Sequence, residues 1–400
     1  QWRAFSPMNP TAADCPSWLA TLLHQASGTV PFRQFMDWAL HHPEHGYYGS
    51  GRVQIGPQGD FATSPSLGPD FATLLGRQLI DLLRTLPDQT GRLSLVEVGP
   101  GEGDLAADLQ AVLARHAPDL IERCELVLVE RSACLRQRQQ HRLEGISGCP
   151  VRWCAIEELQ AAPVQGVVLA HELLDAFPVD RLVLHQGELQ LQGVRLQQQN
   201  QLDWTALAIP APLQKELESS GIALPPPGSD DGWTTEWHST LRPWLASLAS
   251  SVTDGALLVI DYALEASRYY TDRRSEGTLM AYCKGIAGLN PLVHAGEQDL
   301  TAHLCIETLT QAAAHSGWQL QDQRRQGEAL LALGLASDLH ALQQLPATEL
   351  AQALKRREAL LRLVDPAALG DFRWLLYSRG AGADRLSLAT GPDNAGSRPG

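Results

Sequence analysis

Long apolar runs are missing from this sequence of 400 residues. No stretch approaches the roughly 18 apolar residues that a membrane-spanning helix needs, so no membrane partner is expected. Positive charge is also scarce, because 31 Lys and Arg stand against 45 Asp and Glu and give a net charge of −14. Binding to a nucleic-acid duplex depends on clustered Lys and Arg, so no nucleic-acid partner is expected either. The composition suits a soluble globular chain of about two domains.

Cysteine pairs at the spacing C-x-x-C are absent, so the sequence carries no signature of a zinc ribbon or a thioredoxin-type site. Its seven cysteines, an odd number, are spread widely along the chain. Such usage favours a reducing compartment, and we expect a cytoplasmic location. His41, His42 and His45 lie close together, but no acid or Cys stands at standard ligand spacing, so no metal is expected.

The N-terminus, Gln1-Trp-Arg-Ala-Phe5, has no apolar segment of the kind found in signal peptides. No initiator Met is present, so the natural start can lie further upstream. The oligomeric state cannot be predicted from this sequence.

Short apolar runs alternate with segments of helical periodicity between residues 91 and 185. Such alternation predicts an α/β fold with a mostly parallel sheet and helices on both faces. Gln-rich alternation over residues 186–201 predicts antiparallel strands instead. The expected strands are 93–98, 126–130, 151–154, 166–170, 256–262 and 372–377, and the expected helices are 32–40, 70–86, 105–114, 241–250, 300–318 and most of 326–370.

One segment predicts a buried strand, a glycine turn and the start of a helix: Leu-Val-Glu-Val-Gly-Pro-Gly-Glu-Gly-Asp, ending at Asp104. Gly99, Gly101 and Gly103 allow a sharp turn at positive φ and let a ligand lie against the backbone. Asp104 stands where a dinucleotide loop needs its third glycine, which argues against NAD. S-adenosyl-L-methionine has no pyrophosphate to hold, and Glu97 suits its cationic methionine end. The alternative is a turn with only a structural role.

Acidic residues follow the next two predicted strands. Glu130 stands 27 positions after Gly103, enough for one strand–helix–strand unit. A carboxylate at this place in a Rossmann-like site accepts hydrogen bonds from the two ribose hydroxyls. Glu157, after the third strand, is a weaker candidate for a place near the adenine. The alternative for Glu130 is a solvated residue at a strand end.

His171, Glu172 and Asp175 follow the predicted strand 166–170 and are candidate catalytic residues, because ligands bind beyond the carboxyl ends of strands in open parallel sheets. Glu172 and Asp175 are three positions apart and would share one helical face. Paired carboxylates can clamp a guanidinium group, although a helix cap and an ion-pair partner are alternatives. Asp261 also ends a strand and is a candidate substrate contact.

Two segments near the N-terminus are rich in glycine, aromatic and hydroxyl groups, as pocket-lining loops often are. Their candidate substrate contacts are Tyr47, Tyr48, Asp60, Thr63 and Ser64. A packed Ω-loop is the alternative for both segments.

A later segment, residues 296–303, predicts a loop that leads into a helix capped around Asp299 or Thr301. His303 would lie on that helix, either as a substrate contact or as a structural histidine.

In this order, the segments resemble one family, the MidA-like class I methyltransferases. The resemblance covers roughly residues 31–320 and rests on His42-Pro-Glu-His-Gly-Tyr-Tyr-Gly49, Gly59-Asp-Phe-Ala-Thr-Ser-Pro65, Glu97-Val-Gly-Pro-Gly-Glu-Gly103, His171-Glu-Leu-Leu-Asp-Ala-Phe-Pro-Val179, Asp261-Tyr262, Gly277-Thr-Leu279 and Asp299-Leu-Thr-Ala-His303. It implies a Rossmann-like class I methyltransferase fold with an inserted helical and β portion, S-adenosyl-L-methionine as cofactor, and a protein substrate. Mitochondrial members of the family methylate an arginine on a respiratory-complex subunit and assist assembly of NADH:ubiquinone oxidoreductase.

The resemblance also implies a domain order. We expect an N-terminal helical and glycine-rich segment packed on the cofactor domain (1–90), the cofactor-binding Rossmann-like core (91–185), an insertion (186–255), the rest of the core with a helical insertion (256–380) and a disordered tail (381–400).

The sequence departs from the family pattern in three places. Ser66 stands where an acid is usual, His171 stands where an Asn is common, and Lys284-Gly285 replace the usual basic or His residues. The cofactor site is thus expected to be intact, and the departures bear on the acceptor. The expected function is methyl transfer to a protein side-chain nitrogen, with arginine as acceptor. The alternatives are a small-molecule methyltransferase on the same fold and an assembly or scaffold protein that retains the pocket without turnover.

Overall fold

The computed structural model describes residues 13–53, 64–87, 91–283, 286–288, 290–380 and 385–390. The chain forms two compact units, each assembled from three separate segments. Unit 1 comprises Gln1–Val53, Ala176–Thr240 and Glu265–His303, and unit 2 comprises Gln54–Asp175, Leu241–Leu264 and Leu304–Gly400. Of the residues singled out in the sequence, Asp60, Thr63, Lys284 and Gly285 lie outside the described residues.

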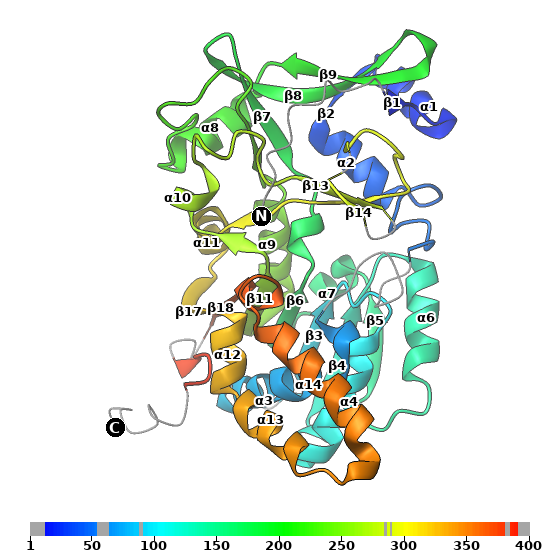
Figure 1. Cartoon of the computed structure of the whole chain (residues 1–400), viewed down its shortest axis with the longest axis vertical. Coiled ribbons are helices and arrows are strands. Elements are labelled where there is room, and N and C mark those ends of the chain that lie inside the picture. Colours follow the sequence, from blue (N-terminus) through cyan, green and yellow to red (C-terminus); the bar gives the residue numbers. More distant parts are fainter. Residues whose placement is uncertain are drawn as a thin grey trace. The chain divides into compact units, whose positions relative to one another are not determined.

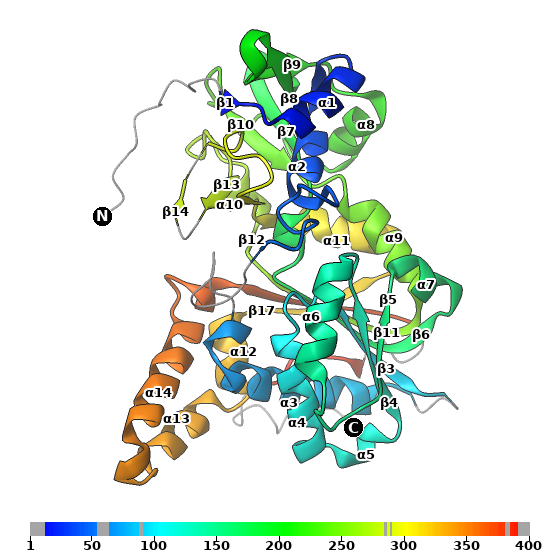
Figure 2. The ribbon, with the colours of Figure 1, turned by 90° about the vertical axis from the view of Figure 1, so that its right-hand side faces the viewer.

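Unit 2 is built on a seven-stranded sheet in the order β17-β18-β11-β6-β3-β4-β5 (Figures 1 and 2). The six predicted strands are confirmed, and their bounds are β3 (Leu93–Val98), β4 (Cys124–Val129), β5 (Val151–Cys154), β6 (Val164–His171), β11 (Val252–Asp261) and β18 (Arg373–Arg379). The seventh strand, β17 (Gln319–Arg325), was not predicted from the sequence. Strands β11, β6, β3, β4 and β5 are parallel, whereas β18 is antiparallel to both of its neighbours.

The sheet is therefore mixed, which corrects the expectation of a mostly parallel one. The reason is the course of the chain after β17. Arg325 at the end of β17 pairs with Arg373 at the start of β18, so the helical segment between them leaves and re-enters the sheet at the same edge. A strand that starts where its neighbour ends has to run antiparallel to it.

Helices cover both faces of this sheet, as expected. In β3, Leu93 and Leu95 join the main hydrophobic core with helices α3 and α4, while Val96, the residue after Leu95, points to the opposite face, where α7, α9 and α11 pack on one another (Figure 2). Strands buried on both faces read as continuous apolar runs, which explains the sequence pattern. The helical elements are η1 (Pro65–Leu67), α3 (Pro69–Thr85), α4 (Asp104–His116), α5 (Pro118–Ile121), α6 (Ala133–Leu143), α7 (Ile156–Ala161), η2 (Leu174–Ala176), α9 (Leu241–Ser251), α11 (Ile306–His315), α12 (Gln326–Ala332), α13 (Leu335–Gln343), η4 (Ala347–Glu349), α14 (Leu350–Val364) and η5 (Leu369–Asp371), and a small parallel pair joins β12 (Ala263–Leu264) to β16 (Leu304–Cys305).

Unit 1 contains an antiparallel sheet, which confirms the strands predicted from Gln-rich alternation. The sheet order is β1-β9-β8-β7-β10, with β2 paired to β8 (Figure 1). The elements of unit 1 are β1 (Ala13–Asp14), α1 (Ser17–Gln25), β2 (Thr29–Pro31), α2 (Phe32–His41), β7 (Asp180–His185), β8 (Glu188–Gln197), η3 (Gln198–Asn200), β9 (Gln201–Leu207), α8 (Ala211–Ser219), β10 (Thr234–Trp237) and α10 (Ala266–Tyr269), with a second sheet of β14 (Ile286–Ala287), β13 (Met280–Cys283) and β15 (Asp299–Thr301).

The helix expected to begin near Asp299 starts later in the chain. Residues Asp299–Thr301 form β15, which pairs with β13, and α11 begins only at Ile306. The polar residues that resembled helix caps instead lie on a strand, because β13 offers a partner for their backbone. His303 consequently lies before α11 and not on it.

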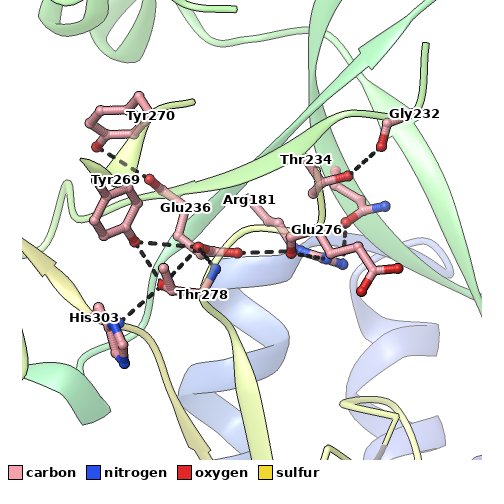
Figure 3. A network of polar contacts seen from close by, with 10 residues as sticks. Arg181, Gly232, Thr234, Glu236, Tyr269, Tyr270, Glu276, Thr278 and His303 are labelled. Carbon is pink, nitrogen blue, oxygen red and sulfur yellow. Dashed lines mark hydrogen bonds and ion pairs between the residues drawn. The ribbon is translucent and has the colours of Figure 1, made fainter. Parts of the chain in front are cut away.

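A buried carboxylate fastens the Gly277-Thr-Leu279 segment to the sheet of unit 1 (Figure 3). Glu236 on β10 is fully buried, and its Oε2 accepts hydrogen bonds from the Thr278 amide at 2.7 Å and hydroxyl at 3.0 Å. Arg181 on β7 places its Nε 3.8 Å from Glu236 Oε1. Gly277 has φ +76°, and a Cβ there would lie 2.1 Å from the same oxygen. The segment therefore needs glycine, and Glu236 needs its cation.

We expect Glu236→Gln to destabilise unit 1 by about 3 kcal/mol, because it removes the ion-pair partner of the largely buried Arg181. Adding Arg181→Met to that variant should restore part of the loss, since no buried charge then remains unpaired. Urea unfolding measures both effects, and Glu188→Gln on an exposed position of β8 is the control. Equal stability of the Glu236 and Glu188 variants would contradict this account.

Candidate cofactor and catalytic site

The carboxyl ends of four adjacent strands in unit 2 bring acidic side chains to one edge of the sheet. Glu97 is the penultimate residue of β3, Glu130 follows β4, Glu172 follows β6, and Asp261 ends β11. These strands are neighbours in the order β11-β6-β3-β4. Residues from three distant parts of the sequence are thus brought together, at the edge where open α/β sheets bind ligands.

The glycine turn after β3 has the backbone geometry that its sequence predicts. Gly99, Gly101 and Gly103 have φ values of +67°, +55° and +85°. A Cβ at Gly99 would lie 2.6 Å from the side chain of Leu173. Gly103 then directly precedes α4 in a left-handed conformation. The loop requires glycine for its dihedral angles and, at Gly99, for close packing as well.

Glu97 presents a buried carboxyl group with an unsatisfied oxygen. The residue is 4% exposed, and its Oε2 has no hydrogen-bond partner among the described residues. Burial raises the pKa of Glu97 to about 8. Buried polar atoms are normally satisfied, so this oxygen calls for a donor from a ligand. The cationic amino group of S-adenosyl-L-methionine has the matching charge and hydrogen-bonding capacity.

Glu130 lies beside the glycine turn and is held in a fixed orientation. Its Oε1 accepts from the Ser132 amide at 2.8 Å, and its Oε2 accepts from Gln139 Nε2 at 3.2 Å. Burial raises the pKa of Glu130, and these hydrogen bonds oppose the rise. Each oxygen keeps a second lone pair, so the carboxylate retains room for two hydroxyl donors. Glu157 is exposed in the first turn of α7, directly after β5.

Glu172 and Asp175 do not share a helical face, which corrects the sequence-based expectation. Glu172 has φ +47° and precedes the short helix η2 that contains Asp175. The cause is Asp261, whose Oδ2 accepts three backbone N–H groups, from residues 173, 174 and 175, at 3.2, 2.8 and 3.2 Å. This carboxylate holds a tight turn in which Glu172 takes a left-handed conformation, uncommon for a residue with a Cβ. Burial raises the pKa of Asp261, and the backbone donors partly offset that rise.

The Glu172 carboxyl group contacts both Ser64 and His171. Its Oε1 accepts from the Ser64 amide at 2.9 Å and lies 3.4 Å from His171 Nε2. Burial raises the pKa of Glu172 to about 8 and lowers the pKa of His171 to about 3. Both side chains are therefore mainly neutral at pH 7 in the ligand-free protein. A cation that approaches this carboxyl group favours its ionised form, and only the ionised form can accept a proton.

The remaining candidate contacts belong to unit 1. Tyr48 donates its hydroxyl hydrogen to Asp299 Oδ1 at 2.9 Å, and the buried Tyr47 packs edge-on against Tyr48. The His303 amide donates to the Thr278 hydroxyl at 3.0 Å, which links it to the network around Glu236 (Figure 3). The segments Gly46–Gly49, Gly277–Leu279 and Asp299–His303 thus contribute to a common set of polar contacts within unit 1.

Gln139 is a site residue that sequence reasoning missed. It is fully buried and donates both to Glu130 and to the Gly101 carbonyl. A signal was present, since Gln139 stands four positions from both Leu135 and Leu143 and so lies on the apolar stripe of its helix. A polar residue on that stripe indicates a buried hydrogen-bonding partner.

Two further features concern metals and membranes. His42 Nδ1 accepts from the amides of Glu44 and His45, both at 3.3 Å, and so caps a turn. Over the described ranges, no group of three or more His, Cys, Asp or Glu side chains is arranged to hold a metal ion. Within the same ranges, no helix has the length and apolar character needed to cross a bilayer.

Proteins of similar sequence and structure carry methyltransferase names. The mitochondrial protein arginine methyltransferase NDUFAF7 homologue of Drosophila melanogaster is 27% identical over 90% of this chain and 84% of its own length. The mitochondrial NDUFAF7 protein arginine methyltransferase of Bos taurus is 31% identical over 39% of this chain and 40% of its own length. A Burkholderia thailandensis protein described as a "likely methyl transferase", solved with S-adenosyl-homocysteine, is 27% identical and superposes with a TM-score of 0.79 over 94% of this chain and 95% of that one.

These relatives overturn the expectation of a cytoplasmic location. Both NDUFAF7 proteins are named as mitochondrial. All seven cysteines are free. Free cysteines fit any reducing compartment, so the cysteine pattern cannot distinguish between such compartments.

A family model covers the larger part of the chain. The family is described as "Putative S-adenosyl-L-methionine-dependent methyltransferase", and its model matches residues 74–323, which include the glycine turn, the strand ends of unit 2 and much of unit 1. The family, the structural relative with its bound S-adenosyl-homocysteine and the buried acids beside the glycine turn agree on the cofactor. The chain belongs to this family of methyltransferases, and its cofactor is S-adenosyl-L-methionine.

Proposed function

We propose that this protein transfers a methyl group to an arginine side chain of a partner protein, such as a respiratory-complex subunit. The named relatives support arginine as the acceptor, since the Drosophila protein aligns over most of both chains. The observation that carries the proposal is Glu172, a carboxyl group with a pKa of about 8 held beside the cofactor loop on a left-handed residue. A buried carboxyl group at this place suits a guanidinium acceptor, which is planar, cationic and rich in donors.

The cofactor roles follow from the contacts of each residue. Glu97 binds the amino group of the methionine end, which supplies the donor that Oε2 lacks. The backbone of Gly99, Gly101 and Gly103 lies against the same end. Glu130 accepts the ribose hydroxyls with its remaining lone pairs. Glu157 lies at the adenine side, as the acid after β5.

S-adenosyl-L-methionine supplies a methyl group activated by its sulfonium sulfur. A nitrogen of the arginine forms a bond to the methyl carbon as the carbon–sulfur bond breaks, and that nitrogen loses one proton. Ionised Glu172 accepts this proton, so methylarginine, S-adenosyl-homocysteine and a neutral Glu172 remain. The reaction needs mainly alignment and exclusion of water, and the buried site provides both.

The other candidate residues act on the acceptor or on Glu172. Neutral His171 packs against Glu172, and Asp261 fixes the turn that presents Glu172 and Asp175. Tyr47, Tyr48, Ser64 and His303, with Asp60 and Thr63, are the proposed substrate contacts.

Incubation with labelled cofactor and candidate partner proteins tests the function, and mass spectrometry of the product identifies the methylated residue. Label on a nitrogen other than arginine would reject the proposed acceptor.

We expect kcat/KM to rise with pH through about 8, because Glu172 must be ionised to accept the proton. Glu172→Gln should reduce the rate by roughly 10²–10⁴-fold, the range typical of a lost general base. Initial rates between pH 6 and 9.5 measure both effects. Glu144→Gln, on an exposed residue after α6, is the control. A rate that falls between pH 7 and 9, or an unimpaired Glu172 variant, would reject the role.

Replacing Glu97 with Gln should weaken cofactor binding by roughly 10–100-fold, because a charge-assisted hydrogen bond is lost. The same change should stabilise the ligand-free protein at high pH. Since burial raises the pKa of Glu97 to about 8, the wild type loses stability as pH rises from the unfolded value of 4.5 to 8, and the variant escapes this loss. The Tm of the variant should exceed that of the wild type by at least about 2–4 °C at pH 9, the gain that about 1 kcal/mol produces, and by nothing at pH 4.5.

Titration calorimetry and thermal melts at both pH values measure these effects, with Glu144→Gln again as the control. Undiminished affinity in the Glu97 variant would remove Glu97 from the cofactor site.

A further inference from the structure

Gln139 connects the ends of three strands. It lies on α6, is fully buried, and makes each of its hydrogen bonds to a different element. Its Nε2 donates to the Gly101 carbonyl after β3 at 2.8 Å and to Glu130 Oε2 after β4 at 3.2 Å. Its Oε1 accepts from Trp153 Nε1 on β5 at 3.2 Å. One side chain therefore joins the glycine loop, the carboxylate of Glu130 and strand β5.

The orientation of this amide is fixed by its partners. An indole N–H can only donate, so the group that faces Trp153 has to be the amide oxygen. The amide NH₂ then faces two acceptors, a carbonyl and a carboxyl oxygen, and supplies one hydrogen to each. All three bonds form at once, and a rotated amide would lose all three.

The rest of α6 strengthens the same attachment. Arg138 pairs with Glu102 at 2.6 Å, and Arg142 pairs with Asp104 at 2.6 Å, so ion pairs lie on both sides of Gln139. A Cβ at Gly103 would lie 3.3 Å from Gln139 Cγ, which shows how closely the loop packs on this side chain. The ion pairs are partly exposed and screened by water, whereas Gln139 is buried, and its bonds are the ones that fix position.

We propose that Gln139 is a positioning residue that sets the glycine loop and the Glu130 carboxylate in one geometry for the adenosine part of the cofactor. The inference rests on the proposed role of Glu130 toward the ribose. Without Gln139, Glu130 keeps its bond to the Ser132 amide on Oε1, whereas its Oε2 loses the side-chain donor that holds it toward the ribose. A carboxylate at position 139 would do worse, because it would place a second anion beside Glu130.

The test compares S-adenosyl-homocysteine with its 2′-deoxyribose analogue, by calorimetry, in wild type and Gln139→Met. Wild type should lose roughly tenfold in affinity with the analogue, as expected for a lost hydrogen bond to a charged group. Gln139→Met should bind S-adenosyl-homocysteine roughly 10–100-fold more weakly and discriminate between the two ligands by less than threefold. The matched control is Gln140→Met, the next residue on the exposed side of α6, which should behave as wild type.

Two further measurements separate positioning from general damage to the fold. Trp153→Phe keeps the ring, removes one hydrogen bond and should cause a smaller loss of the same kind. Hydrogen exchange of the amides of residues 101–103 in the ligand-free protein should be faster in Gln139→Met than in the control. Weaker binding of both ligands with unchanged discrimination, or unchanged exchange, would overturn the positioning role.

The design also separates this inference from the function on which it rests. If Glu130→Gln binds both ligands as wild type does, the ribose role of Glu130 fails. If Glu130→Gln loses discrimination and Gln139→Met keeps it, only the role of Gln139 fails.

Discussion

Burial of carboxyl groups at the ends of β11, β6, β3 and β4 is the constraint on which the site depends. Removing a carboxylate from water is costly, and the cost falls as protein donors replace water. Asp261 receives three N–H groups from one turn and Glu130 receives two donors, whereas Glu172 receives one at Oε1 and Glu97 Oε2 receives none. Burial raises the pKa of Asp261 to about 7 despite its donors, and it raises the pKa values of the two residues with the fewest donors, Glu97 and Glu172, to about 8. Under the proposed function, a cationic ligand supplies the missing donors at these two positions.

The same comparison separates structural from functional carboxylates. Glu236 in unit 1 is as deeply buried, yet it has Arg181 nearby and accepts from Thr278 and Tyr269. Its Oε1 also lacks a hydrogen-bond donor, but Arg181 Nε lies 3.8 Å away and supplies a cation from within the protein, so Glu236 holds a loop. Glu97 has the opposite arrangement, and its unmet oxygen lowers the stability of the ligand-free protein while favouring binding. A binding site of this kind tolerates an unsatisfied buried oxygen in the ligand-free protein because the ligand supplies the missing hydrogen-bond donor.

The local sequence pattern was enough to predict most helices and strands. It could not predict features that depend on residues far away in the sequence. The apolar run at 93–98 became β3 with the same bounds, because a strand buried on both faces reads as a continuous apolar run. The edge strand β5 also has the predicted bounds, 151–154. The direction of β18 depends on the edge at which the long helical segment after β17 re-enters the sheet. A short stretch of sequence does not contain that information. Asp299 and Thr301 looked like helix caps, but β13 pairs with them. The left-handed turn at Glu172 depends on Asp261, far along the chain.

Asp261 and Gln139 solve a common problem in two ways. Catalytic and binding groups beyond strand ends sit on short turns, and a short turn has too few internal contacts to hold one conformation. In each case a buried side chain from another element binds the backbone of the turn: Asp261 binds the amides around Leu174, and Gln139 binds the carbonyl of Gly101. An acceptor side chain suits the first turn and a donor suits the second, because each turn exposes the opposite backbone group. The precision of the site thus depends on residues that hold the turns from other elements. Gln139 is such a residue, and the sequence motif centred on the glycine turn does not include it.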